Sequence, residues 1–140
     1  MRFFVDANVV VYSAVPCPHQ QACREILRAV ANGTAEGSMS TAALEEVWHL
    51  ELSGRIGQVA GLTRNAYGIF APLLPVTDSA FLHALGLRDP QIGPNDRLHV
   101  GTCSVHGIGV ICSADAGFDS VPGLRRVDPL DAQARHRMLS

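Results

Sequence analysis

The chain has 140 residues and a net charge of −2, with 47% apolar and 17% charged residues. This composition excludes a disordered chain, and the length suits one domain, which we expect to span residues 1–140. The 11 basic and 13 acidic residues lack the basic excess of a protein that coats nucleic acid. No apolar run approaches the ~18–20 residues of a membrane span, and Asp6 interrupts the apolar N-terminus where a signal peptide would need a continuous segment. We therefore expect a cytoplasmic protein with reduced cysteines.

The period of the apolar residues predicts short strands that alternate with helices in the first half of the chain. A buried strand is expected at residues 3–5, and a helix follows over residues 19–31. A short strand at 37–40 precedes a helix over 41–52, which Ser40 or Thr41 would cap. Glycines interrupt the next stretch, so the following helix is expected over 62–70.

The second half of the chain continues this alternation. The expected elements are a short edge strand at residues 73–76, a helix from Thr77 to about residue 87, a helix capped by Asn95 or Asp96 and ending near residue 106, and strands at 109–112 and around Val127. Strands separated by helices imply crossover connections. The sequence therefore predicts an α/β fold in which helices cover both faces of a parallel sheet.

Acidic residues follow the predicted strands at their carboxyl ends. Asp6 follows the first strand, Asp115 follows the strand at 109–112, and Asp96 opens the helix that leads into that strand. Glu45 and Glu46 lie in the first turns of the helix after residue 40. Each residue alone is typical of a turn, a cap or a solvated surface, but the carboxyl ends of parallel strands meet at one edge of the sheet. Because clustered carboxylates repel one another and suit Mg²⁺ or Mn²⁺, the pattern predicts a metal site.

Four segments carry these acids, and two short segments close the chain. They are residues 4–12 (FVDANVVVY), 40–47 (STAALEEV), 95–102 (NDRLHVGT) and 112–119 (CSADAGFD), followed by 121–124 (VPGL) and 127–129 (VDP). In this order they resemble the sequence blocks of PIN-domain ribonucleases, especially VapC-type toxins of bacterial toxin–antitoxin modules. The resemblance covers almost the whole chain. It implies a three-layer α/β/α PIN-like domain whose central parallel sheet has the strand order 3-2-1-4-5.

The resemblance also assigns roles to residues of this chain. It implies a catalytic acidic quartet, a subset of it as metal ligands, and two supporting polar residues near the metal. The quartet is Asp6, Glu46, Asp96 and Asp115; the ligands are Asp6, Asp96 and Asp115; the supporting residues are Asn8 and Ser113. The implied cofactor is Mg²⁺ or Mn²⁺, which would activate a water and neutralise charge on the scissile phosphate.

Three further residues have alternative interpretations. Glu45 is the alternative to Glu46, which is preferred because the family's acid follows the strand serine by six positions and precedes an aliphatic residue. Asp119 is either a fifth acid or a surface turn residue. Arg97 either holds flanking phosphates or is an exposed residue at the helix start or an ion-pair partner.

The function implied by the resemblance is a metal-dependent endoribonuclease that hydrolyses RNA phosphodiester bonds, the toxin of a type II toxin–antitoxin system. The implied partners are the RNA substrate, a cognate VapB-type antitoxin and a second copy in a homodimer, with no membrane partner. Apolar surface around Trp48, Leu50, Leu52 and residues 62–74 would serve dimerisation or grip an antitoxin helix in a groove.

Three other interpretations compete with this one. His99, Cys103 and His106 share one helix face, a spacing that zinc can use, but no second ligand pair accompanies them. A haloacid-dehalogenase-like phosphatase also begins with an Asp after the first strand. Such an enzyme needs a second acid two residues later, where this chain has Asn8, and it usually needs a catalytic lysine, but this chain contains no lysine. A non-catalytic PIN-like protein-binding module would not need all four acids.

Overall fold

The computed structural model describes residues 1–140 and contains a four-stranded parallel sheet. The strands are β1 (Arg2–Val5), β2 (Glu36–Ser38), β3 (Val110–Cys112) and β4 (Arg125–Val127). They lie side by side in the order β2-β1-β3-β4. An isolated parallel bridge between Ser40 and Leu74 lies beyond β2, in the place of a further strand. The fold class and the implied strand order are therefore confirmed.

The edge strand that was predicted at residues 73–76 is reduced to a single bridge in the structure. Only Leu74 pairs there: its N–H donates to the Met39 carbonyl (2.9 Å), and its own carbonyl accepts from the Thr41 N–H (3.0 Å). Pro72 and Pro75 flank this position. Pro72 has no N–H to donate to the ladder, and the paired segment enters a helix at Thr41, so pairing ends on both sides of Leu74.

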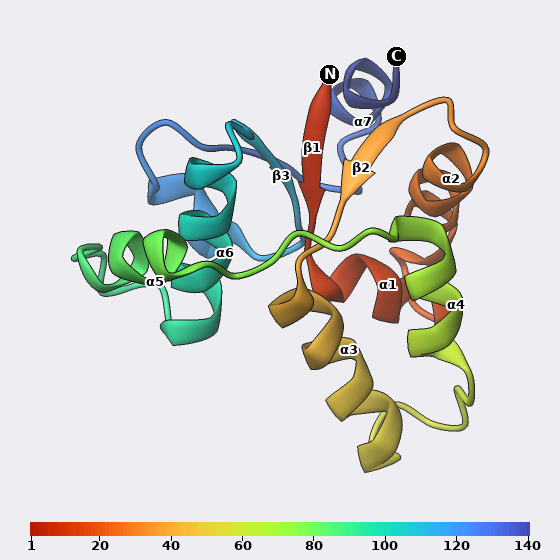
Figure 1. Cartoon of the computed structure of the whole chain (residues 1–140). Coiled ribbons are helices and arrows are strands. Elements are labelled where there is room, and N and C mark those ends of the chain that lie inside the picture. The colour runs from red at the N-terminus through yellow and green to blue at the C-terminus, as the bar shows by residue number, and fades with distance from the viewer.

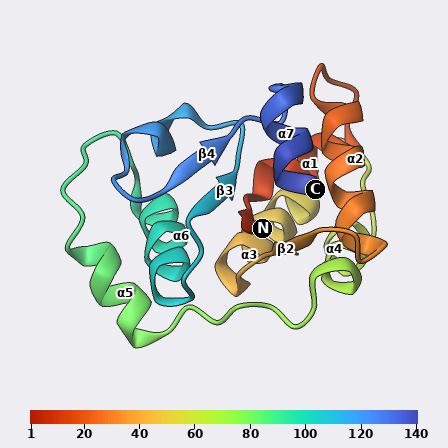
Figure 2. The ribbon, with the colours of Figure 1, turned by 90° about the horizontal axis from the view of Figure 1, so that it is seen from above.

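Helices cover both faces of the sheet. They are α1 (Ala7–Ala14), α2 (Gln20–Ala31), α3 (Thr41–Ser53), α4 (Leu62–Phe70), α5 (Asp78–Leu85), α6 (Pro94–Val105), the 3-10 helix η1 (Ala116–Ser120) and α7 (Ala132–Leu139). Figures 1 and 2 show α5 and α6 on one side of the strands and α1, α2 and α7 on the other. β1 and β2 lead at their carboxyl ends into α1 and α3, which places the first turns of both helices at the same edge of the sheet (Figure 1). No helix of the structure is long and apolar enough to cross a membrane.

The helix ends follow local capping chemistry. Ser40 and Thr77 cap α3 and α5, because their hydroxyls accept hydrogen bonds from the N–H groups of Ala43 (3.0 Å) and Ala80 (3.1 Å). The prediction that Asn95 or Asp96 caps α6 was wrong. Gly93 is the N-cap and Pro94 occupies the first turn, where a missing N–H costs nothing.

Two α-helices, α1 and α7, and the short 3-10 helix η1 were absent from the sequence prediction. In α1, Val9, Val10 and Val11 are buried, and packing in the core overrides the preference of β-branched residues for strands. The side chain of Asp6 accepts the Ala7 N–H and caps this helix. α7 buries only Met138, so its apolar residues leave no helical pattern in the sequence.

Gly101 controls how closely α5 and α6 approach each other. A Cβ at this position would overlap the backbone carbonyl of Ala80 on α5. We expect Gly101→Ala to lower the free energy of unfolding by about 2–3 kcal/mol, because the backbone cannot move aside as a flexible side chain could. Gly68→Ala in α4 is the matched control: no atom lies within 4 Å of its Cβ, and alanine should stabilise the helix by about 0.5–1 kcal/mol. Urea denaturation measures the free energy of unfolding of both variants. Equal changes in the two variants would contradict the close approach of α5 and α6 at Gly101.

Candidate metal centre

Asp6 is the most tightly held acid at the carboxyl edge of the sheet. It follows β1 and is 4% exposed. Its Oδ1 accepts the Ala7 N–H (2.8 Å), while its Oδ2 accepts the Ser113 hydroxyl (2.7 Å) and the Asn8 amide (3.2 Å). Burial raises the pKa of Asp6 above its ordinary value, although His99 and the Ser113 bond act in the opposite direction. The carboxylate is therefore fixed in orientation and costly to keep charged without a positive partner.

Asn8 and Ser113 tie together the ends of β1 and β3. The Asn8 amide donates to Ser113 Oγ (3.1 Å), and Asn8 Oδ1 accepts the Ala114 N–H (3.2 Å). Ser113 Oγ also accepts the Asp115 N–H (3.0 Å). The two predicted supporting residues thus contact Asp6 and position the backbone that carries Asp115.

Glu46 and His99 meet next to Asp6. His99 on α6 is fully buried, and its Nε2 lies 3.2 Å from Glu46 Oε1 and 3.7 Å from Asp6 Oδ1. One ligand atom from each of the three residues lies within 4.8 Å of the other two. Burial lowers the pKa of His99, but Glu46, Asp6 and Asp96 together raise it above its ordinary value.

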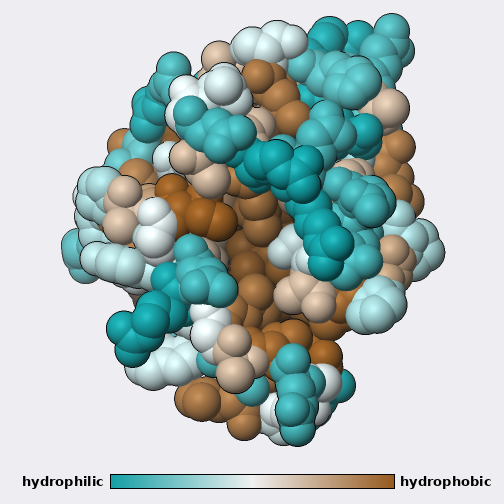
Figure 3. Space-filling model, turned by 90° about the vertical axis from the view of Figure 1, so that its right-hand side faces the viewer, coloured by the Kyte–Doolittle hydropathy of each residue, from teal (hydrophilic) through white to brown (hydrophobic).

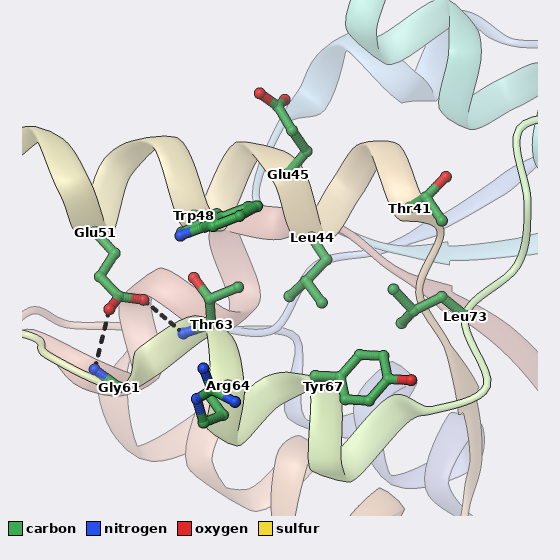
Figure 4. A pocket seen from close by; sticks show the side chains of 10 residues that line it. All are labelled: Thr41, Leu44, Glu45, Trp48, Glu51, Gly61, Thr63, Arg64, Tyr67 and Leu73. Atoms are coloured by element: carbon green, nitrogen blue, oxygen red, sulfur yellow. Dashed lines mark hydrogen bonds between the residues drawn. The ribbon is translucent and has the colours of Figure 1, made fainter.

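Glu46, and not its neighbour, faces this cluster. Glu46 is partly buried beside His99. Glu45 is exposed and lines a separate groove between α3 and α4 (Figure 4). Adjacent positions on a helix project about 100° apart, so only one of the two glutamates can reach Asp6.

Asp96 lies in the first turn of α6, three residues before His99. Burial raises the pKa of Asp96 to about 7, and the negative charges of Asp6, Asp115 and Glu46 add to the shift. Asp115 caps η1 through the Gly117 N–H (2.8 Å) and still contributes to this field. The four predicted acids therefore act on one another, as repelling groups gathered at one edge of the sheet must.

The structure does not bring Asp119 or Arg97 into the cluster. Asp119 is exposed and forms a two-pronged ion pair with Arg126 (2.8 and 3.2 Å). Arg97 donates to the carbonyls of Leu87 (2.7 Å), Asp89 (2.8 Å) and Ile92 (2.7 Å). Its guanidinium therefore holds the loop before α6 in place.

The zinc alternative is not supported by the geometry. His99 joins the acids, but the metal-compatible group includes neither Cys103 nor His106. Burial raises the pKa of Cys103 to about 12, so the thiol stays protonated. His106 instead lies near the Pro75 carbonyl (3.5 Å). The sequence does contain a signal for the place of His99 in the cluster, since Asp96 and His99 are three positions apart and share a helix face.

The raised pKa of Asp96 predicts how the metal-free protein responds to pH. A carboxyl with a folded-state pKa of about 7, above the ordinary 3.8, stabilises the fold while protonated; this contribution is full below about pH 4 and is lost as the pH rises through about 7. With a chelator present, the free energy of unfolding should fall by about 1–2 kcal/mol more between about pH 5 and pH 8 in the wild type than in Asp96→Asn. Urea denaturation at both pH values measures this, and identical falls in the two proteins would contradict the shift.

Comparisons with known proteins cover nearly the whole chain. The family profile described as PIN domain matches residues 3–124. VapC ribonuclease Mb1869c of Mycobacterium bovis and ribonuclease VapC13 of Mycobacterium tuberculosis are each 26% identical over 127 residues, which is 88% of this chain and 97% of each relative.

Solved structures show the same fold. A chain of VapBC2 from Rickettsia felis, bound to a DNA fragment from the promoter, has a TM-score of 0.66 and 16% identity, and the match covers 91% of this chain and 98% of that one. A chain of FitAcB from Neisseria gonorrhoeae has a TM-score of 0.67 and 15% identity, with 92% and 99% covered. The segment matched by the family profile includes Asp6, Glu46, Asp96, His99 and Asp115.

Proposed function

Because the chain belongs to the PIN-domain family, we propose that it is a Mg²⁺- or Mn²⁺-dependent endoribonuclease that hydrolyses RNA phosphodiester bonds as the toxin of a toxin–antitoxin module. The observation that carries the proposal is the meeting of Asp6, Glu46 and His99 within 4.8 Å, in the electrostatic field of Asp96 and Asp115. Relatives that carry the name VapC ribonuclease match the chain over almost their full length. Its RNA substrate would place its action in the cytoplasm.

The chemistry of the donor set fits a divalent cation. Asp6 is buried with a raised pKa, Asp96 has a pKa of about 7, and the Nδ1 of His99 has no hydrogen-bond partner. The four acids outnumber the one histidine, and carboxylate oxygens are the ligands that Mg²⁺ and Mn²⁺ prefer. We assign Asp6, Asp96 and Asp115 as ligands. A bound ion would supply a more acidic water and charge neutralisation at the phosphate.

The side chains of this chain would hold the Asp6 carboxylate in a fixed orientation and accept the proton that the attacking water loses. Ser113, Asn8 and the Ala7 N–H fix the Asp6 carboxylate before any substrate arrives. Such preorganisation avoids reorganisation cost during the reaction. The side chain of Glu46 is 23% exposed, so solvent water can reach it. Glu46 would accept the proton of the attacking water, whose oxygen forms the new bond to phosphorus as the ribose oxygen leaves.

The two rival functions have less support from the geometry. In a haloacid-dehalogenase-like phosphatase, the residue at position 8 would act as a general acid. Asn8 cannot donate a proton in this way, and its amide is used by Asp6 and Ser113. A non-catalytic binding module would have no reason to keep several repelling acids at a structural cost.

We propose that an antitoxin of the VapB type docks an apolar helix on the helical face of the protein. A groove of about 540 Å³ lies between α3 and α4, where Leu44 points towards Tyr67 and Trp48 lies above Thr63 (Figure 4). Glu51 closes one end by accepting the N–H groups of Gly61 (3.0 Å) and Thr63 (2.8 Å). Helix-in-groove recognition uses apolar anchors in grooves of this kind.

A second hollow on the same side of the molecule supports this partner. Figure 3 shows an apolar depression on the face that carries α2 and α4. A pocket of about 290 Å³ between α1, α2 and α4 is lined by Val10, Leu27 and Ile69, among others. A chain with this fold occurs in VapBC2 from Rickettsia felis, which is bound to a DNA fragment from its promoter. Co-expression with the product of a neighbouring gene for a small DNA-binding protein tests the toxin assignment.

We further propose that the chain forms a homodimer through α5. We also propose that residues 1–140 form a single PIN-like domain. Phe81, Leu82 and Leu85 are exposed on α5, and such a cluster is typical of an association surface. α7 lies beyond the segment matched by the family profile, yet it adds Met138 to the buried core. Light scattering of the purified protein measures the oligomeric state.

Incubation with total cellular RNA tests the proposed activity directly. The wild-type protein with Mn²⁺ or Mg²⁺ should cut RNA at defined internal positions, which sequencing of the new 5′ ends would map. Reactions with a chelator in place of the ion are the control. Absence of metal-dependent internal cuts in any RNA of the producing cell would contradict the proposed function.

A further inference from the structure

The metal centre contains a nitrogen donor that the four acids do not account for. His99 is 0% exposed; its Nδ1 has no hydrogen-bond partner, and its Nε2 faces only the carboxylate oxygens of Glu46 (3.2 Å) and Asp6 (3.7 Å). A buried imidazole facing two carboxylates is unfavourable unless a proton or a metal ion lies between them. This cost suggests that the ring serves a ligand, because its Nε2 points toward the carboxylates of Asp6 and Glu46.

The distances around Nε2 match those between ligands of one ion. Nε2 lies 3.2 Å from Glu46 Oε1 and 3.7 Å from Asp6 Oδ1. Two atoms bound to one ion at about 2.0–2.2 Å and at a right angle are about 3 Å apart. Only a small closure would therefore bring His99 Nε2 and the Asp6 oxygen onto a common ion.

The ring of His99 is also held in place. It packs on Phe4 of β1, with ring centroids 5.3 Å apart and planes tilted by 38°. Both α6 and β1 belong to the buried core, so the ring cannot swing into solvent. A rigid ring with a fixed nitrogen direction is what a metal ligand requires.

We propose that His99 Nε2 joins the Asp6 carboxylate as a metal ligand and makes the centre select Mn²⁺ over Mg²⁺. Imidazole nitrogen suits transition metals, whereas Mg²⁺ prefers oxygen ligands alone, so a nitrogen donor shifts the preference towards Mn²⁺. The proposal rests on the proposed metal-dependent function but concerns which ion the centre prefers. The competing role is a counter-ion, in which protonated His99 neutralises the two carboxylates without touching a metal.

Pulsed electron spin resonance of bound Mn²⁺ distinguishes these roles. Mn²⁺ is added below one equivalent to protein without a histidine tag, so that only the tightest site fills. The wild type should show nuclear modulation from a directly bound ¹⁴N, and incorporation of ¹⁵N-histidine should replace it by the ¹⁵N pattern. This isotope exchange needs no mutation, so it stays informative even where a variant fails to fold.

The His99→Gln variant assigns the nitrogen, and His49→Gln on the exposed surface of α3 is its matched control. We expect the nitrogen modulation to vanish in His99→Gln and to persist in His49→Gln. Calorimetric titration should show the ratio of Mn²⁺ to Mg²⁺ affinity falling by about tenfold or more in His99→Gln only.

Each outcome separates this inference from the proposed function. Bound Mn²⁺ without nitrogen modulation, together with Mn²⁺-dependent RNA cleavage, would overturn the ligand role of His99 and leave the nuclease standing. Modulation that persists in a folded His99→Gln protein would also overturn it. Nitrogen modulation in a protein that cleaves no RNA would support the ligand role and contradict the nuclease.

Discussion

Replacing Asp6 by Asn should lower the rate of RNA cleavage by about a thousandfold or more, which corresponds to about 4 kcal/mol of lost transition-state stabilisation. Asparagine keeps the shape of the side chain, so its oxygen still accepts the Ala7 N–H seen in the structure. It removes the one negative charge that is both buried and closest to the other donors. The expected loss is therefore one of metal binding and not of folding.

The same variant should stay folded without metal, with a free energy of unfolding within about 1 kcal/mol of the wild type's. Neutralising Asp6 relieves repulsion among the acids, while the new NH₂ group can no longer accept the hydrogen bonds of Ser113 and Asn8, so the two effects oppose each other. Asp119→Asn is the matched control, because Asp119 is exposed, paired with Arg126 and outside the cluster. It should cleave RNA at the wild-type rate. Cleavage by a folded Asp6→Asn protein at the wild-type rate would refute the assignment of Asp6.

Removal of the divalent ion should abolish cleavage without unfolding the protein. The core is a cluster of 26 buried residues that does not depend on the metal centre. Addition of Mn²⁺ should restore activity and raise the melting temperature, because the ion binds only the folded state. At a concentration of about 100 times its dissociation constant, the stabilisation is about 2.7 kcal/mol.

Thermal unfolding with chelator and with increasing Mn²⁺ measures this effect. The rise in melting temperature should follow the logarithm of the ion concentration, and Asp6→Asn should show little of it. A rise of the same size in both proteins would mean that the ion binds elsewhere. Full cleavage in the presence of chelator would show that the reaction does not depend on a metal ion.

Much of the fold could be predicted from the sequence, because most of its elements carry the periodicity of their type. The helix expected over residues 62–70 has those bounds, since Gly61 precedes it in a left-handed conformation and apolar residues recur on one face. The valines of α1 were not read as a helix, because β-branched residues favour strands and only burial reverses that preference. Pro72 and the start of α3 at Thr41 limit the strand around Leu74 to one bridge.

The acids of the site could be placed together from the sequence because the carboxyl ends of parallel strands share an edge. The choice of Glu46 over Glu45 rests on the resemblance to the PIN-domain family, whose acid follows the strand serine by six positions, and the structure places Glu46 beside Asp6 and His99. The place of His99 could not be predicted in the same way. A histidine on an apolar helix face is equally typical of a core residue, and only its distances to Asp6 and Glu46 distinguish the two. The role of Arg97 in holding the loop before α6 likewise follows only from its hydrogen bonds to the loop carbonyls, which the sequence does not reveal.

The central claim is that acids far apart in the sequence converge on one divalent ion. Diffraction from crystals grown with Mn²⁺, recorded at a wavelength where manganese scatters anomalously, tests it most directly. We predict an anomalous peak within about 2.5 Å of an Asp6 carboxylate oxygen, with at least one further cluster acid bound to the same ion. Crystals that hold Mn²⁺ only at other places, at an ion concentration that supports full cleavage, would contradict it.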